Sequence, residues 1–387
     1  MEESSHLGGS RHDSHGTTTH VPLTASTAPT MATTDSSDTN TWAIQHVLAL
    51  IEIWALVAQH SGFVGAWRLT GVCRVSRAGV KEWLGTLPGL VVSGGVDGDG
   101  PVSEVWRLDL ATLQWIPMPA LVATRCNHAC CVVRKALVVL GGYVKDEEET
   151  SSRVEMLSAG GADGVFTDFP ALSCGGIAGA TAIAVEESDS AAGQVLLLGG
   201  RDEQGGDKST VRLVDLATGV CTPQAALLDD RFEFAAVRIP DGRVVCAGGY
   251  GALASAEVWG PPASGSSNLA WTWAQLPAMS IGRYGSCGCV MSDGRFAVLG
   301  GMCTGGYTSS CEALMVDRDE HWHSLPPMHH ARGHFACAAV ARCIIVAGGL
   351  GTPSAEVYDE ALNRWIQLPC EVPGGNTYPM MMGSALL

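Results

Sequence analysis

Basic residues are scarce in this sequence. The 387 residues include 23 Lys and Arg against 39 Asp and Glu, so the formal net charge is −16 at pH 7. Non-specific nucleic-acid binding needs a basic face that neutralises phosphates. The composition therefore argues against a nucleic-acid-binding protein. With 46% hydrophobic residues, the chain can still bury a large core.

An apolar run long enough to cross a membrane is also missing. The most apolar stretch, 42–58, contains Gln45, His46 and Glu52. It falls short of the roughly 18–20 residues that a span needs, and a charge within a span is costly. A membrane anchor is therefore a minor alternative, and we expect no membrane partner.

The N-terminus has no secretory signal. The opening MEESSHLGGSRHD lacks both a basic and an apolar region, and Arg11 is the one Arg or Lys in residues 1–41, which leaves a transit peptide a weak alternative. The 14 cysteines show no repeated spacing, and several lie in apolar runs such as NHACCVV (127–133). We interpret them as reduced, buried side chains and predict a cytoplasmic or nuclear protein.

Motifs of catalysis and cofactor binding are absent. The sequence has no G-x-S-x-G elbow, no P-loop and no H-E-x-x-H. Its histidine-rich stretch, HWHSLPPMHHARGH (321–334), does not have the spacing of a structural zinc site. We expect no enzyme, no cofactor and no metal, with an oxidase or epimerase as a minor alternative.

One short phrase, an aliphatic run followed by two glycines, occurs six times. The first glycines of the six doublets stand at positions 94, 141, 199, 248, 300 and 348. Such a regular spacing is the mark of a repeat architecture. The last repeat divides into four short strands, FACAAV, CIIVAGG, AEVYD and RWIQLP. The sequence therefore predicts an all-β fold of six four-stranded blades, that is, a six-bladed β-propeller.

The first repeat lacks its first strand, because the residues before position 89 have a helical pattern. The C-terminal residues 381–387, MMGSALL, are a strand of the missing type. We expect this strand to pair into the first blade and close the ring, which removes open sheet edges. Each glycine pair then provides a sharp turn after the second strand. The fourth-strand tryptophans are expected to wedge between blades: Trp115, Trp273, Trp322 and Trp365.

Three segments follow from these patterns. Residues 1–41 are rich in Ser, Thr, Gly and His, and we predict that they are disordered. Residues 42–88 favour two or three short helices. Residues 89–387 form the predicted propeller.

The repeats resemble the kelch repeat. The last repeat carries the whole pattern, with Arg332 before the first strand, a glycine doublet, Tyr358-Asp359 and Trp365. Other repeats depart from it, with Met156 and Phe166 at the aromatic places of the second, Cys221 for Trp in the third and Gly260 for Asp in the fourth.

Residues 42–88 resemble an F-box, with an apolar Ile51–Ala58 segment and a later V-C-R-V-S-R (72–77). The L-P that usually opens an F-box is absent. The resemblance implies a Skp-type adaptor and a cullin as partners. The implied adaptor contacts are Ile51, Trp54, Leu56, Val57, Trp67, Leu69, Val72 and Cys73. The alternative is that these helices only cap the ring.

A mouth of the central channel is the expected site for a protein substrate. Some kelch proteins use arginines there to hold acidic peptides, and a purely structural role for the arginines is equally open. The loops 97–100, 145–150 and 202–208 should lie on the same face and are acidic, which would suit a basic partner instead. The candidate substrate-binding residues are Arg125, Arg231, Arg283, Arg332, Tyr143, Arg201 and Tyr250.

Taken together, the sequence predicts a non-enzymatic substrate-recognition adaptor of an SCF-type ubiquitin ligase. The alternative is a kelch interaction scaffold without a ligase link.

Overall fold

The computed structural model describes residues 44–145, 150–157, 164–185, 190–250, 254–261, 270–374 and 381–387. The chain divides into two units, Met1–His46 and Val47–Leu387, and the description below concerns the second. The segment predicted to be disordered, 1–41, lies outside the described residues, as does most of the acidic loop 145–150.

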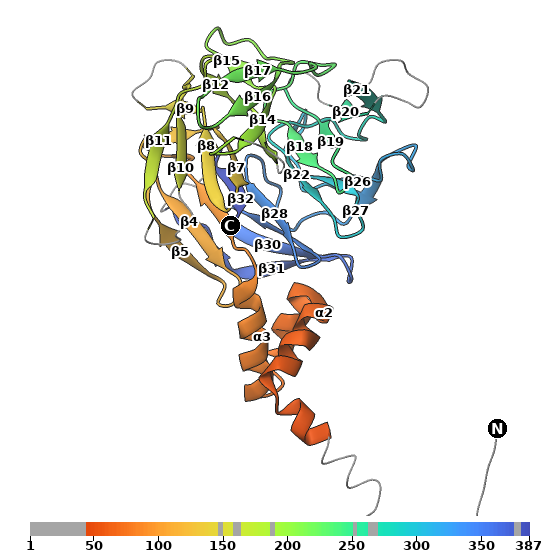
Figure 1. The fold of residues 1–387 in the computed structure, drawn as a ribbon. Coiled ribbons are helices and arrows are strands. Elements are labelled where there is room, and N and C mark those ends of the chain that lie inside the picture. Colours follow the sequence, from red (N-terminus) through yellow and green to blue (C-terminus); the bar gives the residue numbers. More distant parts are fainter. Residues whose placement is uncertain are drawn as a thin grey trace, which may run out of the picture. The chain divides into compact units, whose positions relative to one another are not determined.

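Six four-stranded antiparallel sheets are arranged around a common centre (Figure 1). Blade I contains β32 (Gly383–Leu386), β1 (Leu90–Ser93), β4 (Val105–Asp109) and β5 (Gln114–Met118). Blade II contains β7 (Ala129–Val133), β8 (Ala136–Leu140), β10 (Val154–Leu157) and β11 (Phe166–Phe169). Blade III contains β13 (Thr181–Val185), β14 (Gln194–Leu198), β16 (Val211–Asp215) and β17 (Cys221–Pro223).

The remaining blades follow the same order of strands. Blade IV contains β18 (Ala235–Arg238), β19 (Val244–Ala247), β20 (Ala256–Gly260) and β21 (Thr272–Leu276). Blade V contains β22 (Cys287–Val290), β23 (Phe296–Leu299), β26 (Cys311–Leu314) and β27 (His323–Leu325). Blade VI contains β28 (Ala336–Val340), β29 (Cys343–Ala347), β30 (Ser354–Asp359) and β31 (Arg364–Glu371). The predicted six-bladed propeller is confirmed.

Four two-stranded ladders lie on the loops between blades and strands. They pair β2 (Val96–Asp97) with β3 (Gly100–Pro101), and β6 (Arg125–Cys126) with β9 (Tyr143–Val144). The others pair β12 (Ile177–Ala178) with β15 (Arg201–Asp202), and β24 (Met302–Cys303) with β25 (Gly306–Tyr307). All four contain a strand that directly follows a glycine doublet, so these loops all lie at one end of the channel.

The C-terminal strand closes the ring as predicted. β32 pairs antiparallel with β1, so that Leu90 faces Leu386 and Ser93 faces Gly383. The backbone of Leu387 also exchanges hydrogen bonds with Gly89. The innermost strand of blade I thus comes from the far end of the chain, and each of the six blades has four strands.

The glycine doublets turn the chain in the way that the sequence indicates. In all six, the first glycine has φ between 55° and 75° and the second between 92° and 114°. These are left-handed conformations that a side chain makes costly. At the second glycine, for example Gly301, the N–H donates to the carbonyl of Arg332 in the next blade. Each doublet therefore ends a strand, and those of blades I to V also join two blades by such a hydrogen bond.

The fourth-strand tryptophans join neighbouring blades. Trp273, Trp322 and Trp365 are each 6–7% exposed. Their indole N–H groups donate to carbonyls that follow the preceding blade: Ala225, Pro277 and Pro326, at 2.8–2.9 Å. Trp115 of blade I packs into the core that blades I and VI share with the helices. The predicted wedge is confirmed.

A short helical stretch at 44–48 and two longer helices precede β1 (Figure 1): α2 (Ile51–Leu69), which kinks at Gly62, and α3 (Arg74–Thr86). Gly62 has φ 69°, and a Cβ there would stand 3.3 Å from the carbonyl oxygen of Ala341. The next residue, Phe63, donates its N–H to that same oxygen at 3.2 Å. Ala341 lies in the turn between β28 and β29, so α2 is anchored on blade VI.

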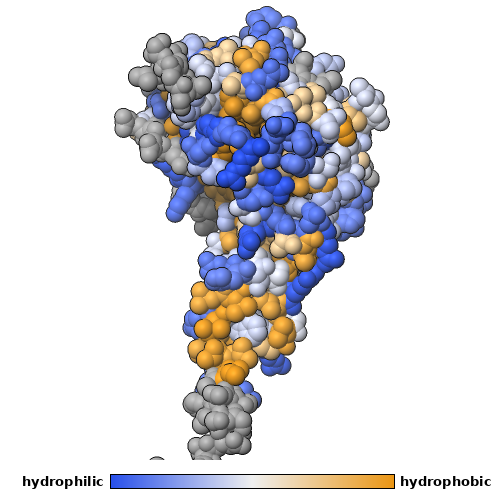
Figure 2. Space-filling view, turned by 90° about the vertical axis from the view of Figure 1, so that its right-hand side faces the viewer, coloured by the Kyte–Doolittle hydropathy of each residue, from blue (hydrophilic) through white to orange (hydrophobic). Residues whose placement is uncertain are grey.

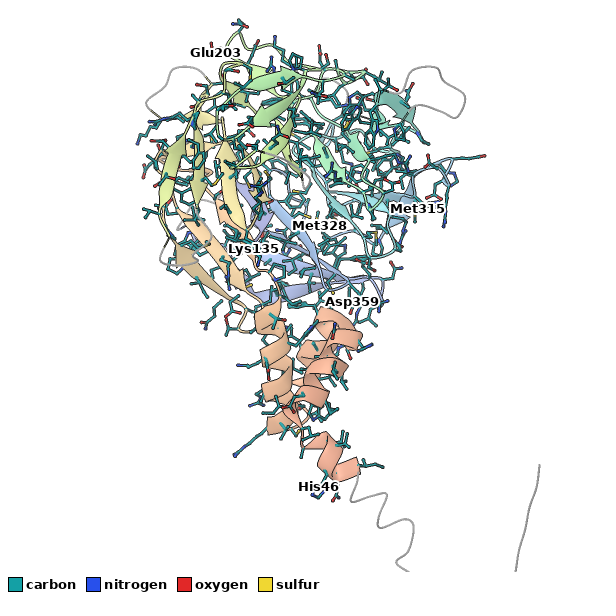
Figure 3. All side chains as sticks on the ribbon, viewed as in Figure 1. His46, Lys135, Glu203, Met315, Met328 and Asp359 are labelled. Atoms are coloured by element: carbon teal, nitrogen blue, oxygen red, sulfur yellow. The ribbon has the colours of Figure 1, made fainter. Side chains whose placement is uncertain are left out.

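The helices share one hydrophobic core with blades VI and I. Phe63, Val80 and Leu84 are 0–1% exposed and belong to the same cluster as Leu110 and Val340. Leu110 follows β4 and Val340 ends β28, so the contact is at the end of the blades away from the glycine doublets. Figure 3 shows Asp359, at the end of β30, close to the helices. The helices and the propeller are therefore one packed unit.

Candidate functional site

The four arginines that precede first strands are buried. Arg125, Arg231, Arg283 and Arg332 are each 0% exposed. Each guanidinium pairs with a glutamate on the third strand of its own blade: Glu155, Glu257, Glu312 and Glu356. A guanidinium without exposed surface cannot bind a peptide. The expectation that these arginines line the mouth as donors is therefore wrong, and the structural role left open by the sequence is the one that the geometry supports.

Each Arg–Glu pair joins several segments of its own blade. In blade V, Arg283 donates to the carbonyls of Gly300 and Ser310 at 2.8 Å and to Glu312 at 2.7 Å. Glu312 in turn accepts the N–H of Ser280 at 2.8 Å, in the segment that enters the blade. Entry segment, glycine doublet and third strand thus meet at one buried ion pair. The four arginines precede first strands as predicted, but their guanidinium groups bind acceptors within their own blades.

Blade III replaces both members of this pair. Ile177 takes the place of the arginine, because its carbonyl accepts the N–H of Gly142 as the other arginines accept from their doublets. Arg212 takes the place of the glutamate, two residues after the carbonyl to which the first glycine of the doublet donates. Both partners change together, so no buried charge is left alone.

The Glu356 pair makes stability depend on pH. Burial raises the pKa of Glu356, but bonds from His329 and Arg332 outweigh it and hold the pKa below the ordinary 4.5. The stability that ionised Glu356 contributes is present above pH 4.5 and is lost as the pH falls through the folded-state pKa. Urea unfolding is expected to show Glu356→Gln costing about 3 kcal/mol at pH 7, and much less at pH 3. A cost that stays constant with pH would contradict this account.

Six residues form a closed ring of backbone hydrogen bonds around the channel. The N–H of each donates to the carbonyl of the one before, at 2.7–3.1 Å, and Met381 completes the circle between His334 and Asn127. All six have φ between 53° and 59°, although only two are glycines. One residue comes from each blade, two places after the arginine position in blades II to VI. The ring members are Asn127, Gly179, Glu233, Gly285, His334 and Met381.

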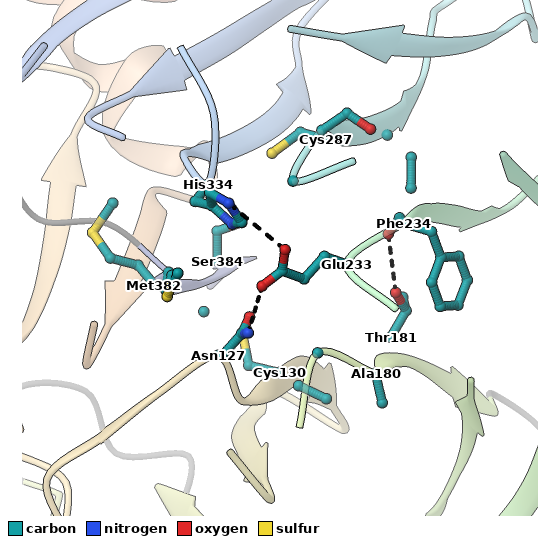
Figure 4. A pocket seen from close by; sticks show the side chains of 18 of the residues that line it. Asn127, Cys130, Ala180, Thr181, Glu233, Phe234, Cys287, His334, Met382 and Ser384 are labelled. Atoms are coloured by element: carbon teal, nitrogen blue, oxygen red, sulfur yellow. Dashed lines mark hydrogen bonds and ion pairs between the residues drawn. The ribbon is translucent and has the colours of Figure 1, made fainter. Parts of the chain in front are cut away.

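Three side chains of this ring meet across the channel (Figure 4). Glu233 accepts a hydrogen bond from the Asn127 amide at 2.6 Å, and its other oxygen is 3.6 Å from Nε2 of His334. The Glu233 and His334 side chains are 7% and 6% exposed. Burial lowers the pKa of His334, although the charge of Glu233 raises it. Burial thus disfavours a cationic His334 beside the Glu233 carboxylate.

A cavity of about 290 Å³ adjoins this cluster and is lined by the innermost strands. Two polar atoms in its wall have no hydrogen-bond partner among the described residues: Nδ1 of His128 and Oγ of Ser286. These side chains are 6% and 8% exposed. Burial, aided by the charge of Arg125, lowers the pKa of His128 to about 3, so its ring is neutral. Unpaired buried polar atoms are rare, so this cavity is a candidate binding site.

Tyr143, Arg201 and Tyr250 lie on the rim of the mouth, directly after the doublets of blades II, III and IV. The Arg201 guanidinium is 4.2 Å from the ring centre of Phe232 and 5.8 Å from that of Tyr250, and it pairs with Asp207 at 2.9 Å. Burial raises the pKa of Tyr143, and the nearby Arg201 opposes the rise. Tyr250 is 56% exposed. These three predicted residues are thus brought together at one end of the channel.

The helical segment presents an apolar face, visible as an orange area in Figure 2. Among the predicted adaptor contacts, Ile51, Leu56, Val57 and Val72 are 39–61% exposed. Cys73 is exposed as well, and its sulfur caps α3 by accepting the N–H of Ser76 at 3.3 Å. An exposed apolar face of this kind usually marks a partner surface.

Three predicted adaptor contacts are engaged within the protein. Trp54 donates to the carbonyl of Leu48, and its Cβ lies against α3 at Gly79. Trp67 donates to the carbonyl of Leu110 at 3.2 Å, and Leu69 packs against the core shared with the propeller. Trp67 and Leu69 are therefore corrected from adaptor contacts to propeller contacts.

Comparison with known proteins gives two partial matches and no match to a family model. Two F-box/kelch-repeat proteins of Arabidopsis thaliana are similar, one 44% identical over 54 residues and the other 36% identical over 52. These stretches cover 12% and 13% of this chain, and 14% and 15% of those proteins. The chain thus matches only about a seventh of the length of these curated relatives. The chain is thus a six-bladed propeller preceded by helices, and short stretches of it are similar to F-box/kelch-repeat proteins.

Sequence reasoning missed the cross-channel cluster of this propeller. A signal was present, since the places two residues after the repeat arginines read Asn127, Glu233, Gly285 and His334. A position that is glycine in one repeat and charged in another calls for comparison between repeats.

No helix among the described residues is long and apolar enough to cross a membrane. The described part of the chain also holds no cluster of metal-ligating side chains.

Proposed function

We propose that this kelch protein is the substrate-recognition subunit of an SCF-type ubiquitin ligase, located in the cytoplasm or nucleus. The helical segment binds a Skp-type adaptor, which links it to a cullin, and the channel mouth binds a protein substrate. The observation that carries the proposal is the exposed apolar face of helices that are packed rigidly onto the propeller. The partial similarity to F-box/kelch-repeat proteins supports it.

The geometry suits a mechanism by proximity. The helices pack on the strand ends of blades VI and I, and the mouth with Tyr250 and Glu233 lies at the opposite end of the channel. The substrate and the adaptor can therefore bind at the same time without competing. Because helices and blades share one core, a substrate bound at the mouth is held in a fixed relation to the adaptor. Catalysis by this chain itself is not required.

Charged substitutions on the apolar face are expected to abolish adaptor binding. Leu56→Asp and Val72→Asp each place a carboxylate on a side chain that is more than half exposed, so the fold should tolerate them. If this face is the docking surface, each lowers the affinity for a purified Skp-type adaptor by about tenfold or more. Pull-down and calorimetric titration with the full chain measure this.

Gln59→Asp is the matched control, because Gln59 is an exposed polar residue on the same helix. It is expected to change the adaptor affinity less than twofold. No binding by the unaltered chain would overturn the ligase proposal and leave the second candidate, a kelch scaffold whose helices cap the ring. Trp67 and Leu69 contact the propeller, so part of the apolar sequence of the helices is explained without an adaptor. This observation favours the second candidate.

A further inference from the structure

Glu233 stands at a position where its backbone is strained. Its φ is 54°, and the equivalent ring positions are glycines in blades III and V, Gly179 and Gly285, and non-glycine residues in the other three blades. A non-glycine residue in this conformation is strained and persists where the surroundings or the function require its side chain. The chain accepts the strain here and places a carboxylate in the channel. The surroundings of the Glu233 carboxylate indicate its role.

This carboxylate has no cationic partner in contact among the described residues. Asn127 is neutral, and His334 is 3.6 Å away with a pKa that burial lowers. The repeat arginines of blades II, IV, V and VI are each paired with a glutamate of their own blade. Arg201 acts on Glu233 from a distance and is paired with Asp207. The floor of the mouth is therefore a buried negative charge that an incoming cation could neutralise.

Aromatic rings lead from solvent to this charge. Tyr250 is exposed and packs edge-on against Tyr284, with ring centres 5.2 Å apart. Tyr284 packs edge-on against His334 at 6.3 Å, and His334 adjoins Glu233. Faces of such rings attract ammonium and guanidinium groups. The cavity beside Glu233 also offers the unpartnered Nδ1 of His128 and Oγ of Ser286 as further polar contacts.

The geometry points to a basic side chain, the ammonium of a lysine or the guanidinium of an arginine in a partner polypeptide, as the group that the mouth binds, with Glu233 as its acceptor. This inference rests on the proposed function, in which a protein segment binds at the mouth. It replaces the acidic peptide that exposed arginines would have implied. Arg201 on the rim would then orient the segment, and the carboxylate would select its basic residue.

The test is a selection of displayed random dodecapeptides on the full chain, followed by fluorescence anisotropy of the selected peptides. Four forms are compared: unaltered, Glu233→Gly, Glu233→Gln and Asp99→Asn. Glu233→Gly keeps the left-handed backbone that glycines adopt in blades III and V, so its thermal unfolding midpoint should stay close to that of the unaltered chain. Asp99→Asn removes an exposed carboxylate from the loop 97–100 on the same face and serves as the control.

We expect the unaltered chain to enrich peptides with Lys or Arg. Replacing that residue by norleucine or citrulline, or Glu233 by Gly or Gln, should weaken binding about tenfold or more, and Asp99→Asn less than twofold. Enrichment of acidic peptides, absence of any basic preference, or a basic preference that survives Glu233→Gly would overturn the inference. Spermidine that competes as strongly as the peptides would do so too, because the cation would then come from solution. The adaptor titration is independent of all these outcomes, so the two proposals fail separately.

Discussion

A chain that ends at residue 380 is expected not to form the closed propeller. Such a chain lacks β32, and β1 would lose its inner partner along Leu90 to Ser93. Leu90, Val91 and Val92 are 0–2% exposed in the intact protein. Exposing side chains of this kind costs roughly 1.5–3 kcal/mol each, and a whole domain is stable by only about 5–15 kcal/mol. Met381 would also be missing from the hydrogen-bonded ring around the channel.

Thermal unfolding followed by circular dichroism, together with limited proteolysis, measures this loss. The matched control is the full chain with a Gly-Ser extension after Leu387, which moves the end of the chain without removing β32. We expect the control to unfold like the original and the shortened chain to lack a cooperative transition. A synthetic peptide of residues 381–387 should partly restore the transition. An unchanged unfolding midpoint after truncation would show that the inner strand does not close the ring.

The repeat architecture could be predicted because its signal is local and is copied six times. A glycine doublet after an aliphatic run indicates a turn with positive φ, which glycine adopts at the lowest energetic cost. The doublet is present even in blade III, where Cys221 replaces the tryptophan. Closure by residues 381–387 could be inferred because the first blade lacked one strand and the chain end supplied one. Both inferences needed strand order, and neither needed side-chain geometry.

The direction of the arginine side chains could not be predicted in the same way. Spacing placed Arg125, Arg231, Arg283 and Arg332 correctly before first strands, but burial depends on a partner from a strand that lies 24–30 residues later. The partner glutamates occupy the second place after the carbonyl that receives the doublet's first N–H, a place defined by backbone pairing. The side chain of a long charged residue near a channel can thus be buried within its blade or face the channel, and the sequence of one blade does not distinguish these two orientations.

The helical segment shows the same difficulty. An apolar residue on a helix can face the propeller or a partner, and α2 carries apolar residues on both faces. Trp67 and Leu69 turned out to pack on the propeller, whereas Leu56 and Val72 face solvent. Sequence alone could identify the set of apolar residues but not divide it. The division depends on the kink at Gly62, which turns the second half of α2 against blade VI.

Removing one member of a buried Arg–Glu pair is expected to destabilise the propeller strongly. In blade V all five N–H donors of Arg283 have acceptors, in Ile281, Gly300, Ser310 and Glu312. Glu312→Ala leaves the buried guanidinium without a counter-charge and frees the N–H of Ser280. We expect a loss of about 3–5 kcal/mol in the free energy of unfolding, measured by urea denaturation at pH 7.

The double variant Arg283→Leu/Glu312→Leu decides whether the charge or the packing carries this cost, because it removes both charges together. Blade III, with Ile177 and Arg212 at these places, shows that a blade can form without the pair. If the cost of Glu312→Ala comes from the orphaned charge, the double variant is more stable than that single variant, even though it changes more atoms. If the double variant is the less stable of the two, the pair acts through the hydrogen bonds that Arg283 makes to the doublet and the third strand. Glu312→Gln further separates the contribution of the charge from that of the hydrogen bonds, because it keeps an acceptor near Arg283 while removing the charge. The replacement of the pair in blade III leaves Arg212 half-buried and Arg201 on the rim of the mouth, paired with Asp207.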